Sequence, residues 1–239
     1  MRSRWNDEWW SITFGGPIGS VVNALIAEVW WITPNRITWL SFLCKLAAAP
    51  LLLAGTPRAD LAVVVLLQVH TVLDCMDGSL ARYRGASSVM GAFLDKATDM
   101  IGLLAIMACF GWRVYRDTGD AFAISVALLI AGAILLRSYL FWVVHALERD
   151  RKVPKPTVGD RRRDFSMMSV RERAVMMLKS QWKIINFSEA DLYFWLALGI
   201  AIGHMREMVY VCGVANGFWA CVIVGFRFVT VVKLDRAKP

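Results

Sequence analysis

The sequence lacks the paired-cysteine motifs of zinc sites and disulfide frameworks. Its five cysteines form no CxxC pair and mostly sit inside apolar runs, where a thiol behaves as a small core residue. It also lacks a polar stretch long enough for a separate soluble domain. No cleavable signal peptide is predicted, because Asp7 and Glu8 lie where a signal carries positive charge alone. No nucleic-acid-binding motif accompanies the basic residues, so nucleic acid is not an expected partner.

Apolar residues are what the sequence has in excess. They make up 57% of the 239 residues, and eleven of them are tryptophans. The mean hydropathy is +0.50. Soluble domains average about 45–50% apolar residues, and several runs here reach about 20 residues, the length of a membrane-spanning helix. The composition predicts an all-α, polytopic membrane protein rather than a soluble domain with a large core.

The chain divides into a short leading segment and a helical domain. Residues 1–33 contain Gly15, Gly16 and Pro17, which break any span, so an amphipathic segment at the membrane surface is expected there, with Trp30 and Trp31 at headgroup level. Residues 34–239 are predicted to form one domain of six spans. Their approximate ranges are 35–53, 61–82, 90–112, 121–147, 191–203 and 208–232, and the fifth is the shortest.

The basic residues predict the orientation. The formal net charge is +8, and most of the 27 lysines and arginines fall at the termini, after the second span, or in the basic segment 148–188. The positive-inside rule places these segments in the cytoplasm. The protein is thus expected to be an integral membrane protein whose basic segments face the cytoplasm, in the inner membrane if it is bacterial. Its positive charge suits anionic lipids.

Four aspartates interrupt this apolar pattern within DCMDGSLARYRGASSVMGAFLDKATD. Asp74 and Asp77 share a helix face at positions i and i+3, and Asp95 and Asp99 do so at i and i+4. The short RGASS turn between the two helices predicts that they pack as antiparallel neighbours. The four carboxylates are then expected to line one pocket, open to the cytosol, near the inner ends of the two spans.

Four carboxylates so close together need cations. Ligands that are all oxygen favour Mg²⁺ or Mn²⁺, and four are enough to bridge two metals about 3.5–4 Å apart, the arrangement used for phosphoryl transfer. Small residues at Gly78, Ala81 and Gly91 leave room for a ligand to approach the backbone. Arg82 is placed to bind a phosphate in a bidentate manner.

These residues resemble a known family signature. The pattern Asp-x2-Asp-Gly-x2-Ala-Arg-x8-Gly-x3-Asp-x3-Asp, from Asp74 to Asp99, is similar to that of the CDP-alcohol phosphotransferases, with every position present. Pro34, Asn35 and Thr38 resemble the family's PNxxT element at the start of the first span. The six-span layout with a leading surface helix is also similar, so the resemblance covers most of the chain.

The resemblance implies an activity and residue roles. Family members transfer a substituted phosphate from a CDP-linked alcohol to the hydroxyl of a second alcohol and release CMP. Homodimers are typical of them. Asp74, Asp77 and Asp95 match metal ligands, and Asp99 matches the general base that also approaches the second metal. The positions that match contacts to CDP are Asn35, Thr38, Gly78, Ala81, Arg82 and Gly91.

Two basic residues within spans suit the substrates' phosphates. Lys45 and Arg137 are candidates to bind the acceptor or a phosphate, with the alternatives that Lys45 pairs elsewhere and that backbone carbonyls satisfy Arg137. A divalent-cation transporter is the competing class, but a transport path needs polar groups through both leaflets, and the acidic cluster lies in one half.

The expected substrates are a CDP-linked lipid, with CDP-diacylglycerol first, and a small polar alcohol. Inositol phosphate, glycerol phosphate and serine are the acceptors considered. Transfer of a choline- or ethanolamine-type phosphate to a lipid acceptor is the alternative. The segment GAFLD resembles members that use inositol phosphate, yet Met100 stands where those members usually have arginine.

Overall fold

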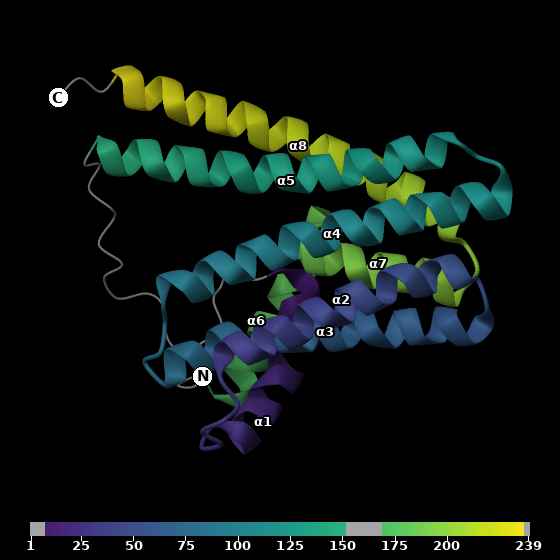
Figure 1. The fold of residues 1–239 in the computed structure, drawn as a ribbon. Helices are drawn as coiled ribbons and strands as arrows, with labels where there is room; N and C mark the ends of the chain where they lie inside the picture. The colour runs from purple at the N-terminus through teal and green to yellow at the C-terminus, as the bar shows by residue number, and fades with distance from the viewer. Residues whose placement is uncertain (1–7, 152–168, 237–239) are drawn as a thin grey trace.

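The computed structural model describes residues 8–151 and 169–236, which form helices and no strand. The elements are η1 (Ser11–Gly15), α1 (Gly16–Ile26), α2 (Pro34–Ala54), α3 (Pro57–Tyr83), α4 (Val89–Thr118), α5 (Phe122–Asp150), α6 (Val170–Ser180), η3 (Gln181–Asn186), α7 (Glu189–Ala201) and α8 (Met205–Arg236). Helices α5 and α8 lie side by side, and α4 packs against both α5 and α2 (Figure 1). The all-α prediction is confirmed.

Four of these helices are long and apolar enough to cross a membrane, namely α2, α3, α5 and α8. A fifth span exists if the bent pair Met177–Asn186 and Glu189–Ala201, with an angle of 77°, counts as one crossing. Helix α4 has 30 residues but carries charged groups toward both ends, including Asp99 and Arg113. The multi-pass character is confirmed, whereas the predicted count of six spans is not.

Local signals in the sequence set where the helices begin and end. Thr33, Thr56 and Ser88 have extended backbones, and each side chain accepts a hydrogen bond from a backbone N–H in the first turn of α2, α3 or α4. Gly55 and Gly119 take positive φ angles of 68° and 75° at the ends of α2 and α4, which glycine adopts without steric cost. They begin the short turns from α2 to α3 and from α4 to α5, and residues 84–88 form the turn between α3 and α4.

The long helices share one core. Its fully buried members include Leu52 of α2, Phe110 of α4, Ile130 of α5 and Tyr193 of α7. Within lipid, close packing stabilises helix pairs more than removal of apolar surface from water does. At Gly199, an added Cβ would lie 2.8 Å from the Met208 side chain, so the backbones of α7 and α8 approach closely there.

The turn between α3 and α4 does not make these helices close neighbours. Each packs extensively against α2, and they make almost no direct contact with each other. The prediction of an antiparallel, directly packed pair is therefore wrong in this respect. The physical reason is that α2 fills the space that a direct contact would occupy. Only the C-terminal end of α3 and the N-terminal end of α4 converge, and a cavity lies between them.

The N-terminal segment, described from residue 8 to residue 33, packs across the C-terminal half of α3. At Gly15 an added Cβ would lie 2.9 Å from Cys75 Sγ, so only a small residue allows this approach. Asn23 donates hydrogen bonds to the Met76 carbonyl and to Ser79 Oγ, at 2.9 and 2.7 Å. Arg84 donates to backbone carbonyls at the end of α1, including Ala27 O at 2.7 Å. These contacts hold the N-terminal segment against α3.

Parts of two predictions lie outside the described residues. Residues 1–7 of the leading segment are one, and residues 152–168 of the basic segment 148–188, with the arginines at 161–163, are the other. Within the described part, Trp30 and Trp31 are exposed, at 85% and 54%. Their placement at headgroup level and the division into residues 1–33 and 34–239 stay predictions.

Candidate active site

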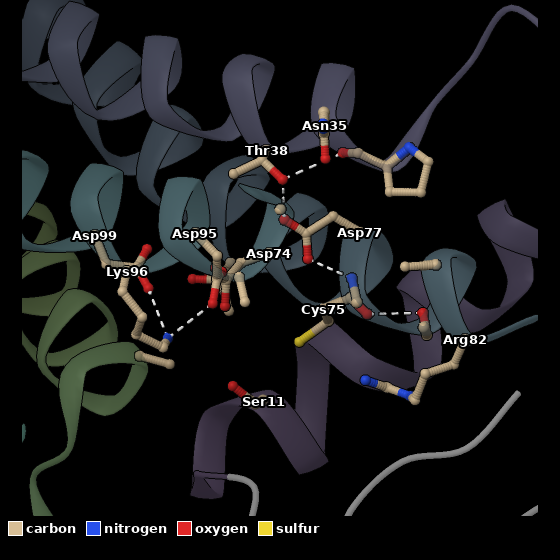
Figure 2. Close-up of a pocket in the computed structure, with 18 of the residues that line it drawn as sticks. Ser11, Asn35, Thr38, Asp74, Cys75, Asp77, Arg82, Asp95, Lys96 and Asp99 are labelled. Carbon is tan, nitrogen blue, oxygen red and sulfur yellow. Dashed lines mark hydrogen bonds and ion pairs between the residues drawn. The ribbon is translucent and has the colours of Figure 1, made fainter. Parts of the chain in front are cut away.

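A cavity of about 530 Å³ opens at the N-terminal ends of α2 and α4 and the C-terminal end of α3. The N-terminal segment and the start of α7 complete its walls. Ten of the residues predicted from the sequence line it: Asn35, Thr38, Asp74, Asp77, Gly78, Ala81, Arg82, Gly91, Asp95 and Asp99. Figure 2 shows Asp99 and Lys96 at one end of this cavity and Arg82 at the other.

Three of the four aspartates converge on one point. Carboxylate oxygens of Asp74, Asp95 and Asp99 all lie within 4.8 Å of one another, although they come from α3 and α4. Oxygen donors at this spacing fit a hard divalent cation. Asp77 lies in the same cavity but is held apart from the three, because it accepts a hydrogen bond from Thr38 Oγ1 at 2.6 Å (Figure 2). It also accepts from the backbone N–H of Gly78.

Two lysines offset the negative charge of this cluster. Lys96 Nζ lies 2.9 Å from Asp95 Oδ2 and 3.2 Å from Asp99 Oδ2, and its side chain is 49% exposed. Lys45 Nζ, on α2, lies 3.0 Å from Asp99 Oδ1 and is almost fully buried, at 1%. Gly102 permits this approach, since an added Cβ would lie 2.6 Å from Lys45 Cε. Lys45 therefore contacts the predicted base directly.

The residues predicted to contact CDP gather at the other end of the cavity. An added Cβ at Gly91 would lie 3.1 Å from Asn35 Oδ1, so glycine lets α4 approach the start of α2. Gly78 and Arg82 are adjacent on α3, and an added Cβ at Gly78 would lie 3.2 Å from Arg82 Nη1. The combination of small residues, one amide and one guanidinium suits a planar base with an attached diphosphate.

The structure does not bring Arg137 to this cavity. Arg137 belongs to α5, and its guanidinium donates long hydrogen bonds to the Asn186 and Phe187 carbonyls and to Asn216 Oδ1, at 3.4, 3.5 and 3.4 Å. The sequence left open the alternative that backbone carbonyls satisfy Arg137. In this structure Arg137 ties α5 to α8 and to the turn before α7, and a direct contact to substrate stays a prediction without support from this geometry.

The start of α7 is held by the N-terminal segment. Glu8 accepts hydrogen bonds from the backbone N–H groups of Glu189 and Ala190, and Trp10 N–H donates to Asp191 Oδ1 at 2.8 Å. Burial, with Asp191 and Glu189 close by, raises the pKa of the Glu8 carboxyl to about 8. Glu8 thus joins the N-terminal segment to the first turn of α7 through these two backbone hydrogen bonds.

Comparison with known proteins agrees with the geometry. The family model of the CDP-alcohol phosphatidyltransferases matches residues 31–219, which include the whole cavity signature. The chain belongs to this family. Divalent-metal dependence is general in it, and the carboxylate cluster of this CDP-alcohol phosphatidyltransferase family member is suited to such an ion.

Three curated relatives align with parts of this family member. A bifunctional IPC transferase and DIPP synthase of Thermococcus kodakarensis is 30% identical over 112 residues, which are 47% of this chain and 24% of the relative. Archaetidylinositol phosphate synthases of Aeropyrum pernix and Pyrococcus horikoshii are 38% and 35% identical. The matches cover 28% and 32% of this chain. They span 34% and 39% of those two relatives, well under two thirds of their length.

Glu189 and Tyr193 on α7 are among the residues of this family member's cavity that sequence reasoning missed. Glu189 lies in the first turn of α7, where an acidic residue after Ser188 indicates a helix start and nothing more. The Tyr193 hydroxyl donates to Glu189 Oε1 at 3.1 Å, and its ring meets His70 edge-on at 5.0 Å. His70 is in turn hydrogen-bonded to Ser41, at 2.6 Å. Only the fold brings α7 to the aspartates.

Proposed function

We propose that this protein transfers a substituted phosphate from a CDP-linked lipid to a hydroxyl of inositol phosphate or a related small alcohol, with release of CMP. The observation that carries the proposal is the convergence of Asp74, Asp95 and Asp99 in a cavity whose other end has Asn35, Gly91 and Arg82. The names of the aligned archaeal relatives support inositol phosphate as the acceptor.

The proposed reaction is a single displacement at phosphorus. The acceptor hydroxyl forms a new P–O bond to the lipid-bearing phosphate, and the P–O bond to CMP breaks. CMP leaves with the electron pair. Asp99 takes the proton of the acceptor hydroxyl as general base. Lys45, 3.0 Å from Asp99 Oδ1, holds that carboxylate in place, and Arg82 binds the diphosphate.

Mg²⁺ or Mn²⁺ is the proposed cofactor, in a site of two ions. Asp74, Asp77, Asp95 and Asp99 would hold them, and the ions would neutralise the diphosphate and the developing charge on CMP. Thr38 fixes the orientation of Asp77 for this role. The active site is proposed to face the cytoplasm, with the lipid tails of the donor in the bilayer, and a homodimer is the proposed assembly.

The test is CMP release by purified protein supplied with CDP-diacylglycerol or its archaeal ether-lipid counterpart, Mg²⁺ or Mn²⁺, and a panel of acceptors. The panel contains inositol phosphate, glycerol phosphate and serine. We expect CMP release with inositol phosphate, and none after EDTA. Release that persists in EDTA would contradict the metal assignment, and no release with any pair would contradict the function.

Asp99→Asn tests the base. We expect turnover to fall by about 100-fold or more, the range for loss of a general base. The protein should still fold in detergent, with a lower melting temperature, because Lys45 then pairs with the more distant Glu189. Asp235→Asn is the matched control, because Asp235 is 80% exposed and, among the residues that the structure describes, pairs with Arg151 alone. It should keep full turnover. Near-normal turnover of Asp99→Asn would show that another group takes the proton.

A further inference from the structure

The two ends of the cavity differ in chemistry. One end has the amide of Asn35, the guanidinium of Arg82 and the small residues of the signature. The other end lies beyond Asp99, where the start of α7 brings Glu189 and Tyr193 to the lining. In Figure 2 the signature residues Asn35 and Arg82 lie away from Asp99 and Lys96, and the carboxylates stand between them.

The geometry of displacement at phosphorus indicates which substrate occupies each end of the cavity. The attacking oxygen and the leaving oxygen lie roughly in line on opposite sides of the phosphorus atom. If CMP leaves toward Asn35 and Arg82, the acceptor hydroxyl must approach from the Glu189 end. This step rests on the proposed function, because it takes the nucleotide to lie on the signature residues.

Glu189 has an unused hydrogen-bond acceptor at that end. Its Oε1 atom accepts from the Tyr193 hydroxyl at 3.1 Å and lies 3.8 Å from Lys45 Nζ. Within residues 8–151 and 169–236 no hydrogen bond or ion pair involves its Oε2 atom. The side chain is 18% exposed and lines the cavity. A ligand in the cavity therefore has access to Oε2.

The surroundings hold Glu189 in one position. Tyr193 is fully buried and fixes one oxygen, while the backbone N–H of Glu189 is directed to Glu8, 3.2 Å away. Lys45 lies between Glu189 and Asp99, at 3.8 and 3.0 Å, so the two carboxylates flank one ammonium group. Asp99 and Glu189 thus lie at the same end of the cavity, where one acceptor molecule can place a hydroxyl at each carboxylate.

We propose that Glu189 determines acceptor specificity by accepting a hydrogen bond from a hydroxyl of a polyhydroxylated acceptor, next to the hydroxyl that reacts at Asp99. A carboxylate suits this role, because hydrogen bonds from hydroxyls to carboxylates are short and strong. A polyol supplies the second hydroxyl, whereas an alcohol with a single hydroxyl leaves Glu189 without a partner.

The experiment compares Glu189→Gln with the unchanged protein in CMP release. Loss of a hydrogen bond to a charged group predicts a rise of about tenfold or more in KM for inositol phosphate. KM for the CDP-linked lipid should stay within about twofold. Glu207→Gln is the matched control, since Glu207 lies in the first turn of α8, is 64% exposed and pairs with His204. Its KM for inositol phosphate should stay within about twofold of the unchanged protein.

A second readout needs no turnover. Equilibrium binding of radiolabelled inositol phosphate to the purified protein should weaken about tenfold in Glu189→Gln. Unchanged binding or unchanged acceptor KM overturns the inference, as does an equal rise in both KM values, which indicates a structural role as the counter-ion of Lys45. Should Glu189→Gln fail to fold, Glu189→Asp replaces it with the same expectations, because it withdraws the carboxylate by one methylene.

Absence of CMP release by the unchanged protein with every donor and acceptor contradicts the proposed function instead, and the binding measurement still decides the role of Glu189.

Discussion

At the scale of single residues, Thr38 and Asp77 are coupled across two helices. The Thr38 hydroxyl donates to Asp77 Oδ2 at 2.6 Å, and both groups are buried. An aspartate that binds a metal needs a fixed orientation, and a hydrogen bond to one oxygen supplies it. Thr38 thus contributes to the site through Asp77, besides the CDP contact that its PNxxT position implies.

Thr38→Val removes this hydroxyl and keeps the shape of the side chain. Hydrogen bonds to charged groups contribute about 1.5–3 kcal/mol, so we expect kcat/KM for CMP release to fall by about tenfold or more. Thr98→Val is the control, because the Thr98 hydroxyl donates to carbonyls of its own helix, Leu94 O at 2.9 Å and Asp95 O at 3.1 Å. Equal activities of the two variants would contradict the role given to Thr38.

At the scale of helices, α2 holds together the two helices that carry the aspartates, α3 and α4. It packs against both α3 and α4, and Lys45 extends from it over Gly102 to Asp99. A buried lysine is costly unless its charge is paired. Asp99 and Glu189 pair it here, and Tyr193 lies under it with its ring centroid 5.9 Å from Nζ. Lys45 thereby links α2, α4 and α7 at the cavity.

Gly102→Ala tests this close approach of α2 and α4. The added methyl would lie 2.6 Å from Lys45 Cε and 3.2 Å from Lys45 Cβ, so the lysine must move away from Asp99. We expect turnover to fall by about tenfold, and the melting temperature to fall as in other overpacked cores. Gly132→Ala in α5 is the control, because its Cβ would meet nothing within 4 Å. Unchanged turnover of Gly102→Ala would show that the position of Lys45 beside Asp99 does not affect the reaction.

At the scale of the whole molecule, the charged groups lie at opposite ends of the bundle. The carboxylate cavity and the N-terminal segment are at one end. At the other end, Arg113 pairs with Asp60 at 3.0 Å and also with Asp117, and Arg206 pairs with Asp120 at 2.8 Å. The helix surfaces between the two ends expose apolar side chains such as Leu128, Trp142 and Phe218, as expected of a surface in contact with lipid.

The predicted orientation is tested by labelling engineered cysteines with a membrane-impermeant maleimide. Ser87→Cys lies in the turn between α3 and α4 at the cavity end, and Ala121→Cys lies before α5 at the other end. In intact cells we expect labelling of Ala121→Cys alone, with Ser87→Cys labelled after permeabilisation. The chain without these substitutions gives the background from its own cysteines. The opposite pattern would place the active site outside the cytoplasm.

The sequence by itself determined those features of the site that depend on local structure. Helical periodicity put Asp74 and Asp77 on one face and Asp95 and Asp99 on another, because that period depends only on backbone hydrogen bonds within each helix. The caps at Thr33, Thr56 and Ser88 are local for the same reason. Apolar content determined the all-α, multi-pass class, since a backbone in lipid must satisfy its own hydrogen bonds.

Only the tertiary structure decided which helices meet and which charges find each other. It put α2 between α3 and α4, turned Arg137 toward carbonyls near α7, and brought Glu189 to Lys45 from 144 positions along the chain. Such pairings depend on how side chains of distant segments fit together, and no periodicity in the sequence records that fit. The aspartates could therefore be located from their spacing, whereas the acceptor end of the cavity required the packing of α7.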